Sequence, residues 1–336
     1  MATIEKNQQA TGVRIGIITD TQHADIDDMI GYSGRKRRYR GVLRTIERAG
    51  KDCTKYACRT IVDLGDCIDR RGHHHVADLN RVEKMWQSSF VGRRLHLIGN
   101  HDLTALPRKT LLDFAARARG MSSSERTYKE TYFVERVNRQ YWLVCLDTYD
   151  LALSKHAWPE DHPKRRAALR MHAAGVERGA LECRGHPELN GGVSNEQLVW
   201  LHKHLEACRT AGERCVVFSH APFFRDVVAF GDALCWNSRS VMRLLHRYVP
   251  DVVSMVVSGH DHVGSTKVDT AGLRHVVLPA ALESEPGQEA FAVLVLREDG
   301  VELHGKGLCR SVSCKVCFAA VGSRGRCSTG DRDQEK

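Results

Sequence analysis

The stretch V-R-I-G-I-I-T-D-T-Q-H, residues 13–23, places a run of mostly apolar residues directly before an aspartate, a glutamine and a histidine. Short apolar runs rich in Val and Ile are typical of strands that are buried on both faces. The polar residues stand where such a strand ends, and their side chains can bind a metal ion. This junction therefore predicts a buried strand that delivers metal-binding groups at its carboxyl end.

Four more apolar runs end in the same way. They are residues 60–64 before G-D-C-I-D (65–69), residues 95–98 before G-N-H-D (99–102), residues 215–219 before His220, and residues 252–258 before G-H-D-H (259–262). One such motif alone is more often a turn, because Asp, Asn and Gly are ordinary turn residues. Five in succession favour a single site, since α/β sheets bind ligands at the carboxyl ends of their strands. Carboxylate, amide and imidazole groups together suit a divalent metal.

Helical patterns between these runs predict an α/β layered fold. Apolar residues recur at helical spacing in three places, and an S-x-x-Q capping box precedes the second. The patterns comprise Tyr39, Val42, Leu43 and Ile46; Leu198, Leu201 and Leu205, after Ser194 and Gln197; and Val241, Met242, Leu244 and Leu245. Residues 142–146 form a further apolar run. Near the C-terminus, residues 273–279, 290–296 and 301–305 are separated by short links, which predicts successive antiparallel strands.

The sequence predicts one large domain between a short arm and a tail. Residues 1–12 are polar and predict an N-terminal arm, whereas residues 13–307 hold all the strand motifs. Within that domain, residues 154–192 are polar, basic and weakly periodic, so we expect an insertion or lid over the scaffold. Residues 308–336 contain Cys, Ser, Gly and charged residues without periodicity, and we expect a disordered tail there.

Composition argues against several classes of protein. The 336 residues are 42% hydrophobic and carry a net charge of +9, which suits a globular protein with a small anionic substrate. No apolar run approaches the ~18 residues of a membrane span, and residues 1–12 lack the apolar core of a signal peptide. We therefore expect a cytoplasmic protein with reduced thiols and no membrane partner. Basic residues are scattered and aromatic residues make up only 7%, so we expect no nucleic-acid partner.

The order D-x-Q, G-D-x-x-D, G-N-H-D, His and G-H-D-H resembles that of the metallophosphatase superfamily, the calcineurin-like phosphoesterases. The resemblance runs from Val13 to about Gly307 and implies a four-layer α/β/β/α sandwich with two metal ions at the strand ends. In that pattern one carboxylate bridges the metals, and a histidine that binds no metal faces the phosphate. The implied residues are Asp66 as the bridge; Asp20, Gln22 and His262 on one metal; Asn100, His220 and His260 on the other; and His101 toward the phosphate.

Gln22 departs from the commonest superfamily pattern, which has histidine at this position. A glutamine here, followed by Tyr32-Ser33-Gly34-Arg35 and an Arg-rich segment expected to be helical, resembles the manganese-dependent ADP-ribose/CDP-alcohol diphosphatases. The basic run at residues 35–38 fits either a distal phosphate or a solvated helix face. This chain also resembles that subfamily at residues 146–150, 189–194 and 235–237, and in the subfamily such segments shape a nucleoside pocket. The residues so implied are Tyr32, Asn190, Cys235, Trp236 and Asn237.

The resemblance implies an enzyme that hydrolyses the diphosphate linkage of a small-molecule nucleotide such as ADP-ribose or CDP-choline. Two metal ions lower the pKa of a bridging water, so we expect the resulting hydroxide to attack phosphorus. Asp66 would hold both ions, and His101, oriented by Asp69 or Asp102, would donate a proton. Gln22 offers an oxygen in place of an imidazole nitrogen, so we expect two Mn²⁺ ions per chain, with Mg²⁺ as a weaker substitute.

Other functions remain open at this point. A cyclic-nucleotide phosphodiesterase or a phosphoprotein phosphatase of the same superfamily would use the same metal ligands. A scaffold that only binds partners fits less well, because such a protein is expected to lose ligands. Here all seven candidate positions hold metal-competent side chains, and His101 is present.

Overall fold

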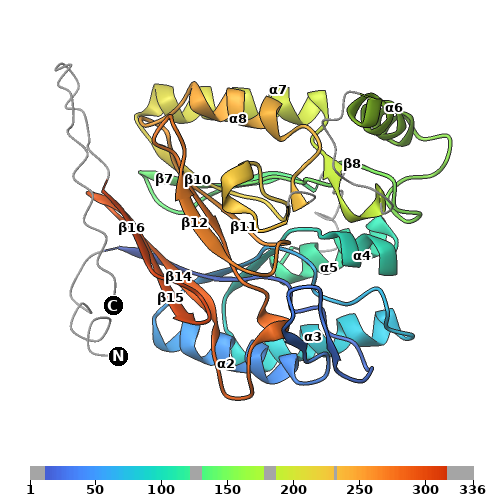
Figure 1. The fold of residues 1–336 in the computed structure, drawn as a ribbon. Helices are drawn as coiled ribbons and strands as arrows, with labels where there is room; N and C mark the ends of the chain where they lie inside the picture. Colours follow the sequence, from blue (N-terminus) through green and yellow to red (C-terminus); the bar gives the residue numbers. More distant parts are fainter. Residues whose placement is uncertain (1–11, 122–130, 178–186, 231–232, 316–336) are drawn as a thin grey trace.

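The structure is a computed structural model that describes residues 12–121, 131–177, 187–230 and 233–315. Two six-stranded sheets lie face to face, and helices cover their outer faces (Figure 1). The four-layer α/β/β/α arrangement predicted from the sequence is confirmed. Among the described residues, no helix is both long and apolar enough to cross a membrane.

The first sheet contains the N-terminal strand at its centre. In sheet order its strands are β16 (Val312–Lys315), β15 (Gly300–Gly307), β14 (Ala290–Arg297), β1 (Val13–Ile18), β4 (Thr60–Asp63) and β5 (Arg93–His96). β1, β4 and β5 run parallel, whereas β14, β15 and β16 are antiparallel to their neighbours. The carboxyl ends of the three parallel strands therefore meet at one edge.

The second sheet has a parallel centre with an antiparallel strand at each edge. In sheet order its strands are β12 (Ser265–Val268), β13 (Arg274–Val277), β11 (Val253–Ser258), β10 (Arg214–Phe218), β7 (Tyr141–Cys145) and β6 (Phe133–Arg136). β7, β10, β11 and β13 run parallel, while β6 and β12 are antiparallel to their neighbours.

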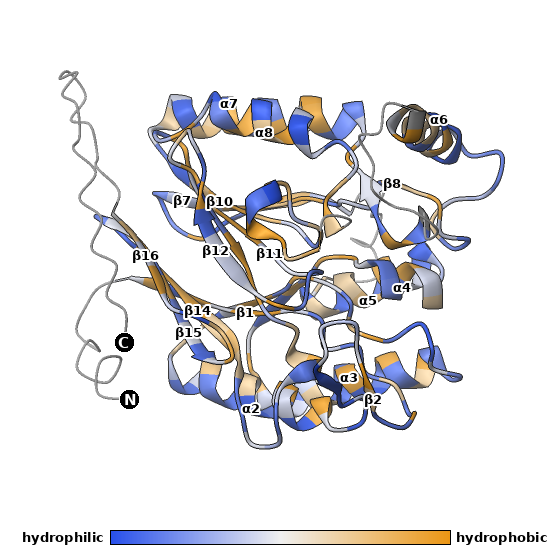
Figure 2. Ribbon diagram, in the orientation of Figure 1, coloured by the Kyte–Doolittle hydropathy of each residue, from blue (hydrophilic) through white to orange (hydrophobic). Residues whose placement is uncertain are grey.

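Buried apolar residues form clusters between the sheets and under each helical layer, and much of the central strands is coloured as hydrophobic in Figure 2. Ile17 of β1 and Phe218 of β10 belong to the cluster between the sheets. The outer face of the first sheet packs against α2 (Val42–Lys55) and α3 (His75–Ser89), and that of the second against α7 (Asn195–Ala211) and α8 (Ser238–His246). The central strands are buried on both faces, which explains their near-continuous apolar sequences.

Shorter elements surround the edge where the parallel strands end. They are α4 (Asn100–Ala105), α5 (Arg108–Ala118), the 3₁₀ turns η1 (Pro187–Leu189), η2 (Arg225–Val227) and η4 (Ala281–Glu283), and the hairpins β2 (Met29–Ile30) with β3 (Lys36–Arg37) and β8 (Leu151–Ala152) with β9 (Gly191–Gly192). β8 and β9 pair at the two ends of residues 154–192. That segment contains α6 (Pro163–Glu177), whose Ala168 packs against Leu151 and Trp236.

Two expectations about these elements need correction. The antiparallel pairing predicted for the C-terminal strands holds for β14 and β15, but β13 lies in the other sheet, parallel to β11. The Arg-rich segment forms β3 rather than a helix, because Gly34 turns the chain at φ +77° and α2 begins only at Val42.

Regular structure near the C-terminus also extends further than we expected. The tail predicted from residue 308 is wrong for residues 312–315, which form β16 by pairing with β15. Val312 and Cys314 are partly buried against the core between the sheets, which explains why this short strand is ordered. The N-terminal arm at residues 1–11 and the rest of the tail, residues 316–336, lie outside the described residues.

Candidate metal centre

The predicted ligands gather at the edge where the parallel strands of both sheets end. Asp20 and Gln22 follow β1, Asp66 follows β4, and Asn100 follows β5 as the first residue of α4; His220 follows β10, and His260 and His262 follow β11. All are buried except His260, which is half-buried. Side chains separated by up to 242 residues therefore meet at one place.

Asp66 stands between two groups of these side chains. On one side, its Oδ2 lies 3.1 Å from Gln22 Nε2, and Asp20 Oδ1 lies 3.4 Å from His262 Nε2. On the other side, Asp66 Oδ2 lies 3.4 Å from His220 Nε2. One ligand atom from each of Asp66, His220 and His260 falls within 4.8 Å of the other two. This placement suits a carboxylate that bridges two ions.

The unpaired atoms of the site test whether metals fit it. Among the described residues, Asp20 Oδ1, Gln22 Oε1 and His220 Nε2 are buried and have no hydrogen-bond partner. Buried polar atoms are nearly always paired, and leaving one unpaired costs about 1–3 kcal/mol. All three are atoms that can coordinate a divalent cation, so the donor set fits the metals that the motifs imply.

The backbone at the ligands adopts a conformation that side chains rarely take. Asp20, Gln22, Asp66, His260 and His262 have φ between +39° and +71°, and the described residues hold only one other non-glycine with positive φ, Ala57. Such residues each cost on the order of 1–3 kcal/mol and concentrate at functional sites. The strained positions therefore coincide with five of the seven predicted ligands.

Each histidine of the site has a partner that orients its ring. His220 Nδ1 lies 2.9 Å from the Leu64 carbonyl, and His260 Nε2 lies 2.7 Å from Asn190 Oδ1. His262 Nδ1 lies 2.9 Å from Glu283 Oε1. When the N–H of one ring nitrogen donates to such an acceptor, the other nitrogen keeps a lone pair for a metal.

Charges within the site hold its carboxylates ionised. Burial opposes ionisation of Asp66, but the charges of His220 and His101 bring its pKa down to about 2. Burial likewise lowers the pKa of His262, but hydrogen bonds with Asp20 and Glu283 outweigh it and raise that pKa to about 9. Burial and the neighbouring His220 lower the pKa of His260 to about 3. In the absence of metals, protonated imidazoles therefore balance the carboxylates.

His101 lies beside the ligands and is oriented by Asp69. Its Nδ1 is 3.0 Å from Asp69 Oδ2, which leaves Nε2 as the nitrogen available to a substrate. Asp102, the other residue considered for this role, instead accepts hydrogen bonds from the backbone N–H groups of Asp66 (2.8 Å), Cys67 (2.9 Å) and Gly99 (3.0 Å). Asp102 thus fixes the loop that carries Asp66.

The predicted pocket residues fall into two places. Tyr32 and Asn190 adjoin the ligands, because the Tyr32 hydroxyl donates to the His260 carbonyl (3.2 Å) and Asn190 contacts the His260 ring. Asn237 instead exchanges two hydrogen bonds with the backbone of Val193, at 2.9 and 2.8 Å. Cys235 and Trp236 precede Asn237 in the chain, and the backbone N–H of Trp236 donates to the Gly191 carbonyl (2.8 Å).

Two residues of the site escaped sequence reasoning. Tyr149 is buried, and its hydroxyl lies 3.3 Å from Asn100 Oδ1 and 3.1 Å from the Leu189 carbonyl. Glu283 is buried against His262. The only local signal for Glu283 is the apolar run L-P-A-A-L directly before it, which marks a buried carboxylate but not its partner.

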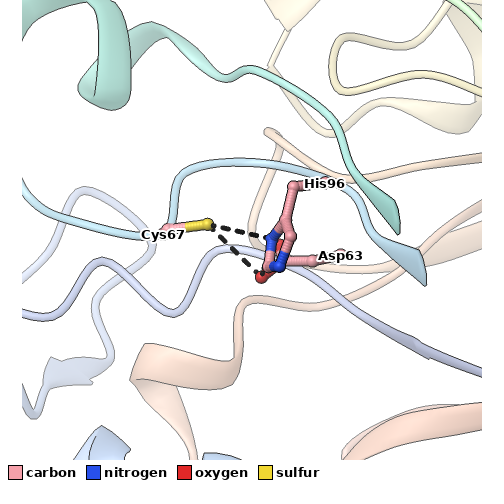
Figure 3. A group of neighbouring side chains, drawn as sticks. All are labelled: Asp63, Cys67 and His96. Atoms are coloured by element: carbon pink, nitrogen blue, oxygen red, sulfur yellow. Dashed lines mark hydrogen bonds and ion pairs between the residues drawn. The ribbon is translucent and has the colours of Figure 1, made fainter. Parts of the chain in front are cut away.

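Asp63, Cys67 and His96 form a second group of potential ligands (Figure 3). Cys67 Sγ is 3.3 Å from Asp63 Oδ2 and 3.7 Å from His96 Nδ1. Burial raises the pKa of the Cys67 thiol and lowers that of His96, so both are neutral. A neutral thiol is a poor metal ligand, and this group acts as a hydrogen-bonded support for the loop that carries Asp66.

Comparison with known proteins agrees with this geometry. The family model for calcineurin-like phosphoesterases matches residues 13–264, from the first strand of the site through its last ligand. The chain belongs to this family. It is therefore a metallophosphoesterase.

Relatives within the calcineurin-like phosphoesterase family extend over nearly the whole chain. A protein of Arabidopsis thaliana named manganese-dependent ADP-ribose/CDP-alcohol diphosphatase is 32% identical over 305 residues, which cover 86% of this chain and 93% of the relative. A human protein of the same name is 27% identical over 315 residues, 87% of this chain and 89% of the relative. The crystal structure of a dimetal phosphatase from Danio rerio superimposes with a TM-score of 0.79 at 26% identity, covering 91% of this chain and 99% of that one.

Proposed function

We propose that this metallophosphoesterase hydrolyses the diphosphate linkage of nucleoside diphosphate-linked small molecules such as ADP-ribose and CDP-choline. The observation that carries the proposal is Gln22 in the ligand set, where the commonest superfamily pattern has histidine. The relatives that share the whole length of the chain support it, because they carry the name of ADP-ribose/CDP-alcohol diphosphatases.

The chemistry divides between the bound ions and the side chains around them. Two divalent ions, held by the seven ligands, would polarise a phosphoryl oxygen and activate water. His101, with its Nδ1 beside Asp69, has Nε2 free to donate a hydrogen bond to a phosphate oxygen or a proton to the leaving group. The leaving group of a diphosphate substrate is itself a phosphate, so His101 has less to contribute than with an alkyl ester.

Tyr32 and Asn190 support a pocket for the rest of the nucleotide. Tyr32 is 56% exposed, although its hydroxyl is anchored to the backbone of His260 and Asp261. An exposed ring held in one orientation beside the ligands offers a flat apolar surface to a base or ribose. Asn190 also contacts His260, because its Oδ1 lies 2.7 Å from Nε2 of the His260 ring.

Manganese is the ion that we propose for the site. Gln22 leaves His262 as the only nitrogen donor on the ion that Asp20 and Asp66 also hold. Carboxylate and carbonyl oxygens suit Mn²⁺ and Mg²⁺, but Mg²⁺ retains water and demands a stricter octahedron. Activity should therefore be higher with Mn²⁺ than with Mg²⁺.

The experiment is hydrolysis of a substrate panel after removal and replacement of the metal. ADP-ribose, CDP-choline, a cyclic nucleotide and a phosphopeptide are compared with Mn²⁺ and with Mg²⁺, and products are identified by chromatography. Formation of AMP from ADP-ribose or CMP from CDP-choline supports the proposal. Preferential release of phosphate from the peptide, or opening of the cyclic nucleotide, would overturn it. Asp66→Asn, which removes the bridging charge, controls for contaminating hydrolases.

A further inference from the structure

Glu283 is a buried carboxylate that contacts the metal site and a surface hairpin at the same time. It is 3% exposed. Its Oε1 lies 2.9 Å from His262 Nδ1, and its Oε2 accepts a hydrogen bond from Ser33 Oγ at 2.7 Å. Arg37 of β3 adds an ion pair, with Nε 3.6 Å from Oε1. Oε1 thus contacts both His262 and Arg37 of the hairpin, and Oε2 holds the hairpin through Ser33.

The hairpin of β2 and β3, residues 29–37, meets the site at a second point through Tyr32. The Tyr32 hydroxyl donates to the carbonyls of His260 and Asp261, at 3.2 and 3.3 Å. Its ring centre lies 5.2 Å from that of His262, and the Arg37 guanidinium lies 4.9 Å from the Tyr32 ring centre. Displacement of the hairpin would therefore disturb the surroundings of His262.

We propose that Glu283 is a positioning residue that couples metal binding at His262 to the position of the Tyr32 hairpin. The inference rests on the proposed functions of His262 as a ligand and Tyr32 as a pocket residue. A carboxylate that accepts the Nδ1–H of His262 directs the Nε2 lone pair toward Asp20 and Gln22, and loss of such a partner typically weakens metal binding about 10–100-fold. Because the same carboxylate also holds Ser33, metal binding at His262 and the position of the hairpin are coupled. This coupling is reciprocal, so each should change the equilibrium of the other by the same factor.

Two variants separate the two contacts. Glu283→Gln keeps the shape of the side chain but removes the charge from both. Ser33→Ala removes the hydrogen bond from Ser33 and leaves both the bond to His262 and the ion pair with Arg37 in place. The matched controls are Glu47→Gln, on the surface of α2 where Glu47 pairs with Lys51, and Ser88→Ala, on the exposed face of α3.

The first measurement is Mn²⁺ binding to the metal-free protein, followed by electron paramagnetic resonance without substrate. We expect Glu283→Gln to weaken binding about 10–100-fold. Ser33→Ala should weaken it by a smaller factor, and the two controls should leave it unchanged. Should Glu283→Gln fail to fold, Ser33→Ala alone tests the coupling, because a serine that acts only on the hairpin would not alter Mn²⁺ affinity.

The second measurement is hydrogen exchange in the hairpin. The Gly31 N–H donates to the Arg35 carbonyl at 2.8 Å, so its exchange reports the closed hairpin. We expect Mn²⁺ to slow this exchange in the parent protein and to slow it less in both variants. Equal exchange with and without Mn²⁺ in a parent that binds the ion, or unchanged Mn²⁺ affinity in Ser33→Ala, overturns the coupling alone. A parent that binds no Mn²⁺ overturns the proposed metal site as well.

Discussion

The contacts of Nδ1 of His101 leave its Nε2 as the atom that could donate a proton at the site. Its Nδ1 lies 3.0 Å from Asp69 Oδ2 and accepts a hydrogen bond from the backbone N–H of Arg70 at 3.4 Å, and the predicted ligand Asn100 belongs to the same turn of α4. The His101 backbone N–H also donates to Asp66 Oδ1 at 2.8 Å, a contact that depends on the main chain and not on the ring. The ring can therefore be removed without removing the support of Asp66.

The variant His101→Ala should lower kcat about 10²-fold or more, the usual contribution of a proton donor. Its metal content should stay at the parent level, because the backbone contact to Asp66 remains. Steady-state kinetics and metal analysis of the same preparations check both statements. His204→Ala, on the half-buried face of α7, is the matched control. Loss of metal in His101→Ala would show that His101 is a ligand.

Gln22 tests the origin of metal preference at one side chain. The Gln22 amide lies beside Asp66 and His262, with its Nε2 3.1 and 3.0 Å from them, and histidine would replace this neutral amide by an imidazole. Imidazole suits Zn²⁺ better than an amide does, so Gln22→His should gain activity with Zn²⁺ relative to Mn²⁺. A metal titration of both proteins after chelation measures this ratio. The same metal profile in parent and variant would show that position 22 does not determine metal choice.

In helix α7, one residue of the predicted capping box caps the helix and the other makes a tertiary contact. Ser194 caps the helix as the S-x-x-Q pattern predicts, and its Oγ accepts the Gln197 N–H at 3.1 Å. The Gln197 side chain does not return to Ser194; it bonds the N–H and carbonyl of Asp147 at 2.9 and 3.0 Å. Gln197, the second residue of the predicted capping box, therefore joins α7 to the loop after β7.

The cap itself is expected to affect stability and not catalysis. Ser194→Ala should lower the free energy of unfolding by about 1 kcal/mol, the usual cost of losing a serine N-cap. Ser194 hydrogen-bonds with Asp150 and Gln197 and with none of the predicted ligands, so kcat per folded molecule should not change. Urea unfolding and kinetics at 25 °C check the two parts, and Ser194→Asp, which retains a cap, should restore the stability. A large loss of kcat in the alanine variant would contradict the assignment.

Elements were predicted well where the signal was local and poorly where it was not. Each strand motif joins an apolar run to the polar residues that follow it, so the ends of β1, β4 and β10 could be found from neighbouring residues alone. The sheet that takes up β13 could not, because its pairing with β11 depends on the packing of distant segments. The helix that the resemblance implied for the Arg-rich segment was wrong, because β3 pairs with β2 across the turn at Gly34.

For the molecule as a whole, the sequence predicted that the candidate ligands would come together, but it did not predict the contacts of Glu283 and Asn190 with His262 and His260. A ligand follows a strand in sequence, whereas Glu283 reaches His262 from a 3₁₀ turn beyond β13, and Asn190 reaches His260 from the end of the 154–192 segment. Those contacts exist only after both sheets and their connections have packed. The charge balance of the site is likewise a property of the folded molecule.

That balance predicts how metal affinity depends on pH. In the metal-free protein burial opposes protonation of His220 and His262, but nearby carboxylates outweigh burial and raise both pKa values to about 9. A metal must displace those protons, so the apparent affinity for Mn²⁺ should increase between pH 6 and pH 8, by up to about tenfold per pH unit for each proton released. Titration with Mn²⁺ at several pH values, with a pH indicator to count protons, measures this.

The same two histidines give opposite trends to the stability of the metal-free and metal-loaded protein. Their pKa values are raised in the folded state, so the stability they contribute without metal is fully present below the unfolded pKa of about 6.5. It is lost as the pH rises toward 9. Bound metal replaces the protons and binds more tightly as the pH rises. The increase in Tm produced by a fixed Mn²⁺ concentration should therefore grow from pH 6.5 to pH 8, and a constant or shrinking increase would show that His220 and His262 do not exchange protons for metal.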